Sequence, residues 1–258
     1  MMTEKVKISA VIISKNEEKN IARCIDSLFG VADEIIVVDS FSDDRTEEIC
    51  RSRNVKFVHK AWMGYSETKN YANTLAGNNY ILSIDADEAL SEDLRNEIIN
   101  LKNKGLDSRA YKIKRLTSYC GKWIRHCGWY PDWKVRLWEK GTGKWEGMIH
   151  EKVVFSEPVK AVSLKSDLLH FSYDSIEDHI RQMSNFSNIM AQESFLKNKR
   201  PVPLKMFLSP VCKFIKAFVL QRGFLDGYYG FVVCTFSAMA TFMKYAKIEQ
   251  LFRQQDNN

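Results

Sequence analysis

Two aspartates separated by one residue, Asp85 and Asp87, have the spacing in this 258-residue chain that most suggests chemistry. They follow Tyr80–Ile84, an apolar run typical of a buried strand. Alternation along an extended segment places both carboxylates on one side, where they repel each other unless a cation or proton intervenes. The pair suits a hard divalent ion that completes its shell with substrate phosphates. The alternative is a solvated acidic turn, with Glu88 and Glu92 nearby.

Two other apolar runs also end in polar residues. The run Val6–Ile13 is followed by Ser14–Glu17, and the run Glu34–Val38 is followed by Asp39. An acid at such a position can accept hydrogen bonds from a ribose or a base, as in dinucleotide-binding folds. We therefore place Asp39 in the site, and we expect Ser42 or Asp43 to cap the helix that follows.

The order of elements explains why these strand ends should meet. Apolar runs alternate with stretches of helical periodicity, which predicts βαβ units and a parallel sheet. The expected strands are 6–13, 34–38, 55–58 and 80–84, and the expected helices cover about 21–28, 47–53, 66–76 and 91–102. Ligands of such sheets bind just beyond the carboxyl ends of the strands. Neither a G-x-G-x-x-G motif nor a P-loop occurs, which argues against a dinucleotide oxidoreductase and a P-loop ATPase.

Composition and charge narrow the class further. A 45% hydrophobic and 27% charged content is that of a globular protein, and the formal charge of +6 suits an anionic partner. The aromatic and basic stretch 111–145 has no dense basic run and contains acids, so we expect no nucleic-acid partner. The six cysteines form no C-x-x-C pair, and the N-terminus has no apolar signal-peptide core. These features predict a cytoplasmic protein with free thiols.

The chain is expected to be helical beyond Asp174, and its last part suggests contact with a membrane. The stretch Leu204–Phe218 mixes apolar residues with Lys205, Lys213 and Lys216, as interfacial helices do. The uncharged stretch Gly227–Met243 either dips into the bilayer or packs as an ordinary buried helix. We predict a helical, membrane-associating extension over 199–258 that attaches peripherally to the inner face of the cell membrane.

Short motifs in the chain resemble those of family 2 glycosyltransferases with the GT-A fold, an α/β fold with a mostly parallel sheet. They occur in the order and at about the spacing of that family. The motifs are Val11–Glu17, Val37–Thr46 and Ser83–Glu88. Further segments resemble the subgroup that includes lipopolysaccharide core β-1,4-glucosyltransferases: Lys69–Ala72, Val135–Trp138, Ile149–Glu151, Gly223–Gly227 and Lys244–Lys247. The likeness covers nearly the whole chain.

The resemblance implies roles for individual residues. Asp39 would hold the nucleoside, with Ser14, Asn16 and Glu17 near the base and ribose, and Asp85 and Asp87 would hold Mg²⁺ or Mn²⁺ against the diphosphate. Lys69 is either a point charge near the phosphates or a solvent-facing helix lysine. His170 either completes the metal shell or serves as a structural hydrogen-bonding residue.

The acceptor hydroxyl needs a base, and the Glu-Asp motif that many relatives use is missing at its usual place. Glu151 is the nearest match, and Glu146 is the rival.

The implied reaction is inverting transfer of a hexose from a UDP-sugar to a hydroxyl of a lipopolysaccharide core or related cell-envelope glycan. The implied glycosyltransferase domain spans 1–198, with a nucleotide-sugar part to about 105 and an acceptor part from about 106. A transferase acting on a protein or peptide, and a catalytically silent sugar-nucleotide-binding scaffold of a glycan complex, are the alternatives.

Overall fold

The computed structural model describes residues 6–147, 151–200 and 202–256. It contains two compact units. The first, here called the sheet unit, comprises 1–116 and 132–171, and the second, the helical unit, comprises 117–131 and 172–258. The predicted functional division at residue 198 stays a prediction.

Most strands and the first four helices belong to the sheet unit. Its strands are β1 (Ile8–Ser14), β2 (Glu34–Asp39), β3 (Lys56–His59), β4 (Tyr80–Asp85), β5 (Glu88–Leu90), β6 (Ala110–Tyr119), β8 (Asp132–Glu139), β9 (Gly143–Glu146), β10 (Lys152–Phe155) and β11 (Val162–Tyr173), of which β6 and β11 continue into residues of the helical unit. Its helices are α1 (Ile21–Leu28), α2 (Thr46–Ser52), α3 (Tyr65–Thr74) and α4 (Glu92–Lys104). The predicted strands and helices of the first hundred residues are all present.

The main sheet is mixed, with the parallel strands at one end. Its order is β3-β2-β1-β4-β8-β6-β11-β5. The strands β3, β2, β1 and β4 pair in parallel, as the βαβ pattern predicted, whereas β8 runs antiparallel to both β4 and β6. A separate antiparallel pair joins β9 and β10. The chain thus adds antiparallel strands to a parallel half-sheet.

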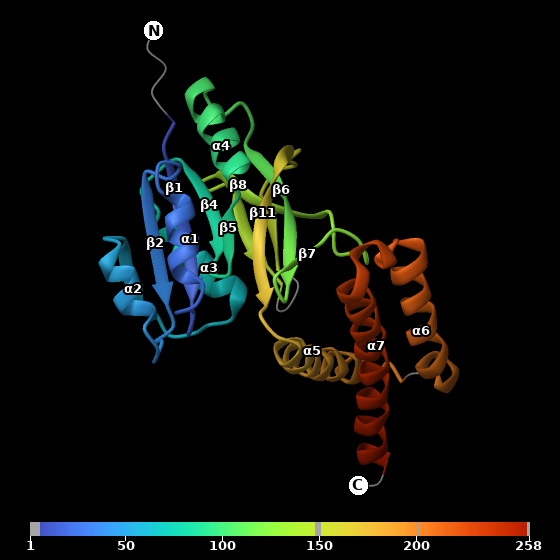
Figure 1. Cartoon of the computed structure of the whole chain (residues 1–258). Helices are drawn as coiled ribbons and strands as arrows, with labels where there is room; N and C mark the ends of the chain where they lie inside the picture. Colours follow the sequence, from blue (N-terminus) through green and yellow to red (C-terminus); the bar gives the residue numbers. More distant parts are fainter. Residues whose placement is uncertain (1–5, 148–150, 201, 257–258) are drawn as a thin grey trace. The chain divides into compact units, whose positions relative to one another are not determined.

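Both faces of the parallel half are buried, which explains why its strands read as continuous apolar runs. On β1, Ile8, Ala10 and Ile12 contribute to one core and Val11 to the other. Helices α1, α2 and α4 add side chains to the first core, and α3 covers the opposite face together with Trp138 and Trp145. Figure 1 shows α1 and α3 on opposite sides of these strands.

The register of the parallel strands brings three of the predicted polar ends together. Ser14 is the partner of Asp39 across β1 and β2, and Ile13 is the partner of Asp85 across β1 and β4. Asp39 and Asp85 therefore lie on the two strands that flank β1, at the same carboxyl edge. This edge positions the candidate site.

The helical unit is built from three long helices and short connecting turns. Its elements are β7 (Lys122–Ile124), α5 (Ile176–Leu196), α6 (Pro203–Ile215), the π-helical turn η1 (Lys216–Leu220), the 3₁₀ turn η2 (Gly223–Asp226) and α7 (Gly227–Asp256). Helix α7 contacts both α5 and α6. The core is aromatic: the buried His179 imidazole lies within ring-contact distance of Tyr119, Tyr173 and Phe236.

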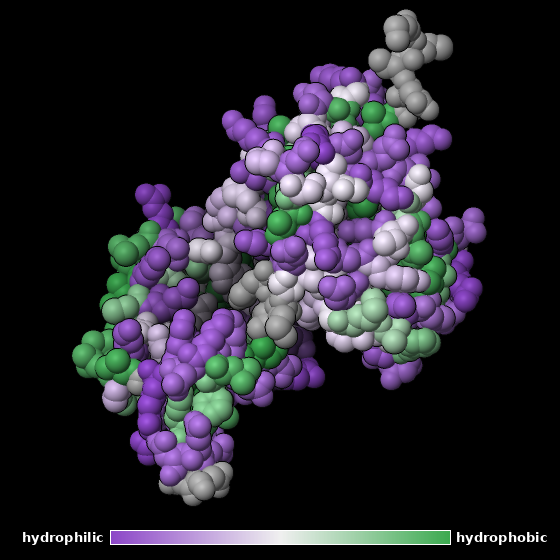
Figure 2. Space-filling model, turned by 180° about the vertical axis from the view of Figure 1, so that it is seen from behind, coloured by the Kyte–Doolittle hydropathy of each residue, from purple (hydrophilic) through white to green (hydrophobic). Residues whose placement is uncertain are grey.

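The segment Gly223–Asp256 is, among the described residues, the single helical stretch long and apolar enough to cross a membrane by length and composition. Core helices of soluble proteins meet the same criteria but are mostly buried, whereas 17% of the apolar window is buried here, although α7 contacts α5 and α6. Exposed apolar side chains are concentrated instead before and at the start of α7, between Val202 and Phe231. Figure 2 shows hydrophobic residues gathered on the surface of this unit.

Candidate active site

Asp39 is held rigidly at the end of β2. It is fully buried, and its Oδ1 accepts hydrogen bonds from the hydroxyls of Ser14 (2.8 Å) and Ser42 (2.6 Å). Its Oδ2 accepts a third hydrogen bond from the Ser42 backbone N–H at 2.7 Å. These three donors replace water as hydrogen-bond partners of the buried carboxylate and fix its orientation. The serine that was expected to cap a helix instead holds the acid.

The expectation that Ser42 or Asp43 caps α2 is wrong. The residue before the helix is Arg45, and no side chain caps the N-terminus of α2. Asp44 supplies the nearest equivalent, because its Oδ1 accepts hydrogen bonds from the backbone N–H (2.9 Å) and the hydroxyl of Thr46. The helix is preceded by Arg45, two residues after Asp43, and Ser42 is instead hydrogen-bonded to Asp39.

The loops after β1 and β2 are tied to each other through the predicted nucleoside-binding residues. The Asn16 backbone N–H donates to Ser42 Oγ, and its side-chain oxygen accepts from the Asp43 N–H. The Glu17 N–H donates to Thr46 Oγ1 at 2.8 Å. Ser14, Asn16, Glu17 and Asp39 are therefore brought together.

Glu17 has an unusual protonation behaviour. Burial raises the pKa of Glu17 to about 7, and the hydrogen bond from Asn20 opposes this rise. The carboxylates of Asp87 and Asp44 add to the rise. A carboxyl group that titrates near neutral pH lies within electrostatic range of the Asp85–Asp87 cluster.

Asp85 lies between two cations. Its Oδ1 is 2.7 Å from Lys69 Nζ, and its Oδ2 is 2.5 Å from a guanidinium nitrogen of Arg136. Burial alone would raise the pKa of Asp85, but Arg136 and Lys69 outweigh burial and hold that pKa well below its usual range. The carboxylate is therefore permanently charged and fixed in direction.

Lys69 is not a solvent-facing helix lysine. Its side chain is 4% exposed, and the ammonium group bridges Asp85 and Glu151, with Nζ 3.0 Å from Glu151 Oε1. The same nitrogen lies 4.5 Å from the centroid of the Trp145 ring, a cation–π contact. Helix α3 thus places a desolvated positive charge directly beside the acidic cluster.

The alternative of a solvated acidic turn is wrong for Glu88, because its side chain is not in contact with water. Its side chain is completely buried and accepts a hydrogen bond from Arg136 at 2.6 Å. Arg115 approaches the same oxygen at 3.4 Å, and the Asp85 backbone N–H donates to the other oxygen. Two arginines compensate a carboxylate that would otherwise be costly to bury. The buried Glu88 thus anchors the turn that carries Asp87 to the interior of the protein.

Asp87 and His170 form a second pair at this edge. His170 on β11 is the cross-strand partner of Glu88 on β5, and its Nε2 lies 3.1 Å from Asp87 Oδ2. Both side chains are partly exposed. Carboxylate oxygens suit both Mg²⁺ and Mn²⁺ as ligands. A mixed set of carboxylate oxygen and imidazole nitrogen suits Mn²⁺ better than Mg²⁺.

The three predicted metal ligands are not assembled into one cluster. Within 6–147, 151–200 and 202–256, no group of three or more His, Cys, Asp or Glu side chains is arranged to hold a metal. The reason is that Lys69 and Arg136 bind the two oxygens of Asp85. Asp87 and His170 are adjacent, so the chemistry of this donor set fits a divalent ion.

The two candidate bases differ sharply in environment. Glu151 is 17% exposed and paired with Lys69, whereas Glu146 is exposed on β9. Because Lys69 contacts both carboxylates, Glu151 lies close to Asp85. Ile149 and His150, which belong to the same motif, lie outside the described residues.

The roles of Arg136, Arg115 and Glu88 in holding the acidic cluster were not predicted from the sequence, in which Arg136 belongs to the motif Val135–Trp138. A signal was available, because Arg136 interrupts the apolar run Val135–Trp138 of a strand and a charge at such a place needs a buried partner. The identity of that partner follows only from the pairing of β4 with β8.

Open α/β sheets bind ligands at the carboxyl edge of their parallel strands, which is the edge where Asp39 and Asp85 lie and where α3 places the buried Lys69. Comparison with known proteins identifies the class. Residues 9–146 match the model of glycosyl transferase family 2, so the chain belongs to that family. It is a glycosyltransferase, and the mixed sheet flanked by helices is its GT-A fold, as the motifs predicted.

The similarity to known glycosyltransferases extends over almost the whole chain. An uncharacterized glycosyltransferase of Rickettsia bellii is 36% identical, over 96% of this chain and 88% of the relative. LpsC of Rhizobium meliloti, a lipopolysaccharide core biosynthesis glycosyltransferase, is 28% identical, over 96% of this chain and 94% of its own length.

Among solved structures, glucosyl-3-phosphoglycerate synthase of Mycobacterium tuberculosis, crystallised with Mn²⁺, UDP and phosphoglyceric acid, is 25% identical. That match covers 43% of each chain with a TM-score of 0.36. Because this score is low, the fold assignment rests on the family match and the sheet topology.

Proposed function

We propose that this glycosyltransferase transfers a hexose from a UDP-sugar to a hydroxyl of a lipopolysaccharide core or related cell-envelope glycan, with inversion and with the help of a divalent ion. The observation that carries the proposal is the bridge from Asp85 through Lys69 to Glu151. It joins the residue predicted at the diphosphate to the residue predicted to activate the acceptor. The similarity to LpsC over nearly the whole chain supports the choice of acceptor class.

The donor would bind along the carboxyl edge of β1, β2 and β4. Asp39 fixes the two loops, containing Ser14, Asn16 and Glu17, between which the nucleoside would lie. Lys69 and Arg136 supply positive charge where the diphosphate would meet Asp85. Positive charge preorganised in a desolvated site stabilises the negative charge that develops on the leaving diphosphate.

Asp87 and His170 would hold Mg²⁺ or Mn²⁺, with Asp85 as the third predicted ligand. The ion supplies Lewis-acid neutralisation of the diphosphate. The structural observation behind this part is the 3.1 Å approach of His170 Nε2 to Asp87 Oδ2 at the strand edge.

Glu151 is the proposed base that takes the proton from the acceptor hydroxyl. Lys69 Nζ donates a hydrogen bond to its Oε1 at 3.0 Å and so holds in place the carboxylate that a base needs. Close to it, Trp62 and Tyr65 are half exposed and pack edge to face, with ring centroids 4.8 Å apart. Burial chiefly raises the pKa of Tyr65, and the Glu151 carboxylate adds to this rise, so the ring lies in the field of the base. Such rings offer a surface for an acceptor sugar.

The Glu151→Gln variant tests this assignment. It should lower transfer by about 10²- to 10⁴-fold, because general base catalysis contributes that much, while the affinity for UDP-sugar stays unchanged. Transfer to acceptor and binding of donor are measured separately, with Glu146→Gln as the control. Near-normal turnover of Glu151→Gln, together with loss in Glu146→Gln, would move the role to Glu146.

The enzyme is proposed to work in the cytoplasm, attached peripherally to the inner face of the cell membrane, where a lipid-linked acceptor is accessible. The exposed apolar side chains between Val202 and Phe231 support this placement.

The experiment that tests the proposed function is a thermal-shift panel of nucleotide sugars with and without Mn²⁺. Binding at 100 times Kd stabilises a protein by about 2.7 kcal/mol, so the true donor should stand out. Hydrolysis of the same UDP-sugar that depends on Mn²⁺ separates an enzyme from a silent scaffold. If no UDP-sugar shifts the transition in either condition, the proposed donor class is wrong.

A further inference from the structure

Helix α6 and the turn η1 present an unusual surface in the helical unit. None of the residues of α6 is buried. Leu204, Phe207, Leu208 and Val211 are each more than half exposed, and Leu220 in η1 is 74% exposed. Monomeric soluble proteins rarely leave so many neighbouring apolar side chains in water without a partner.

The apolar side chains form a stripe along α6. Leu204 and Leu208 are four residues apart, as are Phe207 and Val211, so they project from one side of the helix. Phe214, three residues after Val211 at the edge of this side, packs edge to face with Phe231 of α7, with ring centroids 5.8 Å apart. The apolar stripe is therefore left over after α6 has packed on α7.

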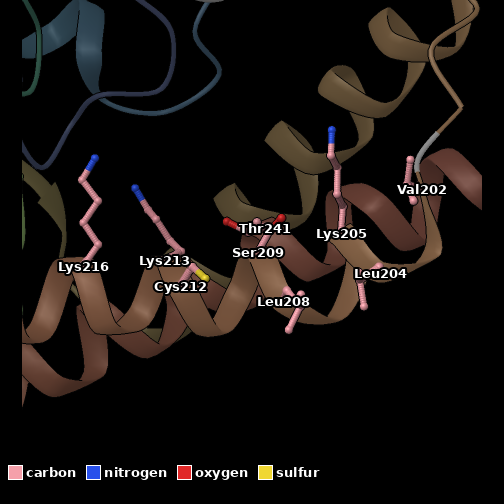
Figure 3. Close-up of a pocket in the computed structure, with 9 residues that line it drawn as sticks. All are labelled: Val202, Leu204, Lys205, Leu208, Ser209, Cys212, Lys213, Lys216 and Thr241. Carbon is pink, nitrogen blue, oxygen red and sulfur yellow. The ribbon is translucent and has the colours of Figure 1, made fainter.

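A row of lysines runs beside this stripe. Lys205, Lys213 and Lys216 line a groove of about 500 Å³ together with Leu204 and Leu208 of the stripe, Ser209 and Cys212 of α6, and Thr241 of α7. Figure 3 shows the three ammonium groups extending to one side of α6, while Leu204 and Leu208 point to the other. Basic and apolar groups thus occupy separate flanks of one helix.

The charge of this segment identifies what it faces. Residues 202–225 contain Lys205, Lys213, Lys216 and Arg222 but no aspartate or glutamate. A protein partner with mixed charges would not explain why this segment lacks acidic residues. A surface of phosphate groups above an apolar layer complements both the lysines and the apolar stripe.

We propose that α6 lies flat in the surface of a bilayer containing anionic phospholipids. Its apolar stripe enters the boundary of headgroups and acyl chains, and Lys205, Lys213 and Lys216 contact the lipid phosphates. Long lysine side chains reach the phosphates while their carbon chains remain beside apolar atoms. The inference rests on the proposed membrane location and specifies its surface and lipid chemistry. Helix α7 then stays packed between α5 and α6 and does not cross the bilayer.

Vesicle sedimentation of the full chain tests the proposal. Vesicles of phosphatidylcholine with phosphatidylglycerol should bind the protein, and vesicles of phosphatidylcholine alone should bind it far less. The triple substitution K205Q/K213Q/K216Q should weaken partitioning to the anionic vesicles by about 100-fold, at about 1 kcal/mol per lysine. A matched triple substitution of exposed lysines in the sheet unit, K104Q/K144Q/K160Q, changes net charge equally and should leave the partitioning within about threefold of the unsubstituted protein.

Cys212 offers a direct probe of the groove. It is the exposed cysteine of the six, since Cys120 is half-buried and the others are buried. An environment-sensitive fluorophore on Cys212 should shift its emission to the blue with anionic vesicles, and millimolar inorganic phosphate should not reverse the shift. This measurement also serves if the triple lysine variant folds poorly.

Three results would overturn the proposal: unchanged binding of the triple lysine variant, release of the protein only by detergent, or competition by inorganic phosphate alone. Release only by detergent would indicate a spanning α7, and phosphate competition would indicate a site for a soluble phosphate. UDP-sugar hydrolysis without vesicles is measured in parallel. Its absence in the unsubstituted protein would count against the proposed function and leave the membrane result standing.

Discussion

The sheet unit and the helical unit treat charge and apolar surface in opposite ways. In the sheet unit, Asp85, Glu88, Lys69 and Arg136 are withdrawn from water and paired with each other. In the helical unit, the His179 imidazole is buried among aromatic rings, one buried carboxylate, Asp226, accepts hydrogen bonds from the backbone N–H groups of Arg125 and His126, and apolar side chains of α6 lie outside. The difference matches what each unit is proposed to bind, a charged small molecule for the sheet unit and an apolar layer for the helical unit.

Burial of polar side chains serves two separate purposes in this protein. Desolvated charges are costly to bury, and they are kept where they must act on a ligand in a medium of low dielectric constant. A neutral buried imidazole costs less, and it serves packing and one hydrogen bond, from or to the Tyr119 hydroxyl at 3.1 Å. The two units should therefore respond differently to charge removal and to pH.

The largest expected effect is the loss of activity in Asp85→Asn. The substitution keeps the shape but removes the charge between Lys69 and Arg136, so kcat/KM should fall by about 10³-fold or more. The measurement is turnover of the UDP-sugar found in the thermal-shift panel. Asp26→Asn, which removes a surface ion pair with Arg53, is the control. A decrease of less than tenfold in Asp85→Asn would contradict the site.

Removing Arg136 should act on stability as strongly as on activity. Arg136→Met leaves the completely buried Glu88 with Arg115 at 3.4 Å as its one cationic partner in the described structure, beside the Asp85 backbone N–H, and the free energy of unfolding should fall by about 3–5 kcal/mol. Urea denaturation measures the change. Arg109→Met, which breaks exposed ion pairs with Glu139 and Glu157, should cost about 1 kcal/mol or less. Similar losses in both variants would remove the distinction between buried and exposed pairs.

His179 should make the helical unit sensitive to acid. Burial lowers the pKa of His179 to about 4, so between about pH 6.5 and 4 the unfolded chain binds a proton that the folded chain does not. Stability should therefore fall as the pH drops, by about 2 kcal/mol from pH 7 to 5.

Thermal melts at pH 7 and pH 5 measure this loss of stability. The difference in stability between the two pH values should be smaller in His179→Asn than in the unsubstituted protein. Tyr119→Phe removes the hydrogen bond but keeps the burial, so the pH dependence should remain. If Tyr119→Phe abolished it, the hydrogen bond and not burial would be the cause.

Glu17 should give the smallest effect, with the opposite sign. Because burial raises its pKa to about 7, the folded chain keeps a proton that the unfolded chain releases above about pH 4.5. Its contribution to stability should thus fall as the pH rises through this window, by about 1 kcal/mol for a partly exposed group. Melts of Glu17→Gln, which removes this slope, are compared with those of the exposed neighbour variant Glu18→Gln. If stability fell more steeply with decreasing pH in the unsubstituted protein than in Glu17→Gln, the raised pKa of Glu17 would be contradicted.

Much of the sheet unit follows from the sequence because its signals are local. β-branched runs define β1, β2 and β4, helical periodicity defines α1 and α4, and polar residues mark the strand ends. These choices depend on the residues within one element, so the carboxyl edge with Asp39 and Asp85 could be predicted before the structure.

Other features depend on pairing between distant segments, and only the tertiary structure decided them. β8 runs antiparallel to β4, which carries Arg136 to Asp85, and α3 carries Lys69 to Glu151 across 82 residues of sequence. Likewise, the sequence of α6 showed lysines mixed with apolar residues, but packing on α7 decided which flank stayed exposed. The acidic pair was visible in the sequence alone. That two cations already hold one of its members is a property of the folded protein, because charges so far apart in the chain become partners only through the sheet.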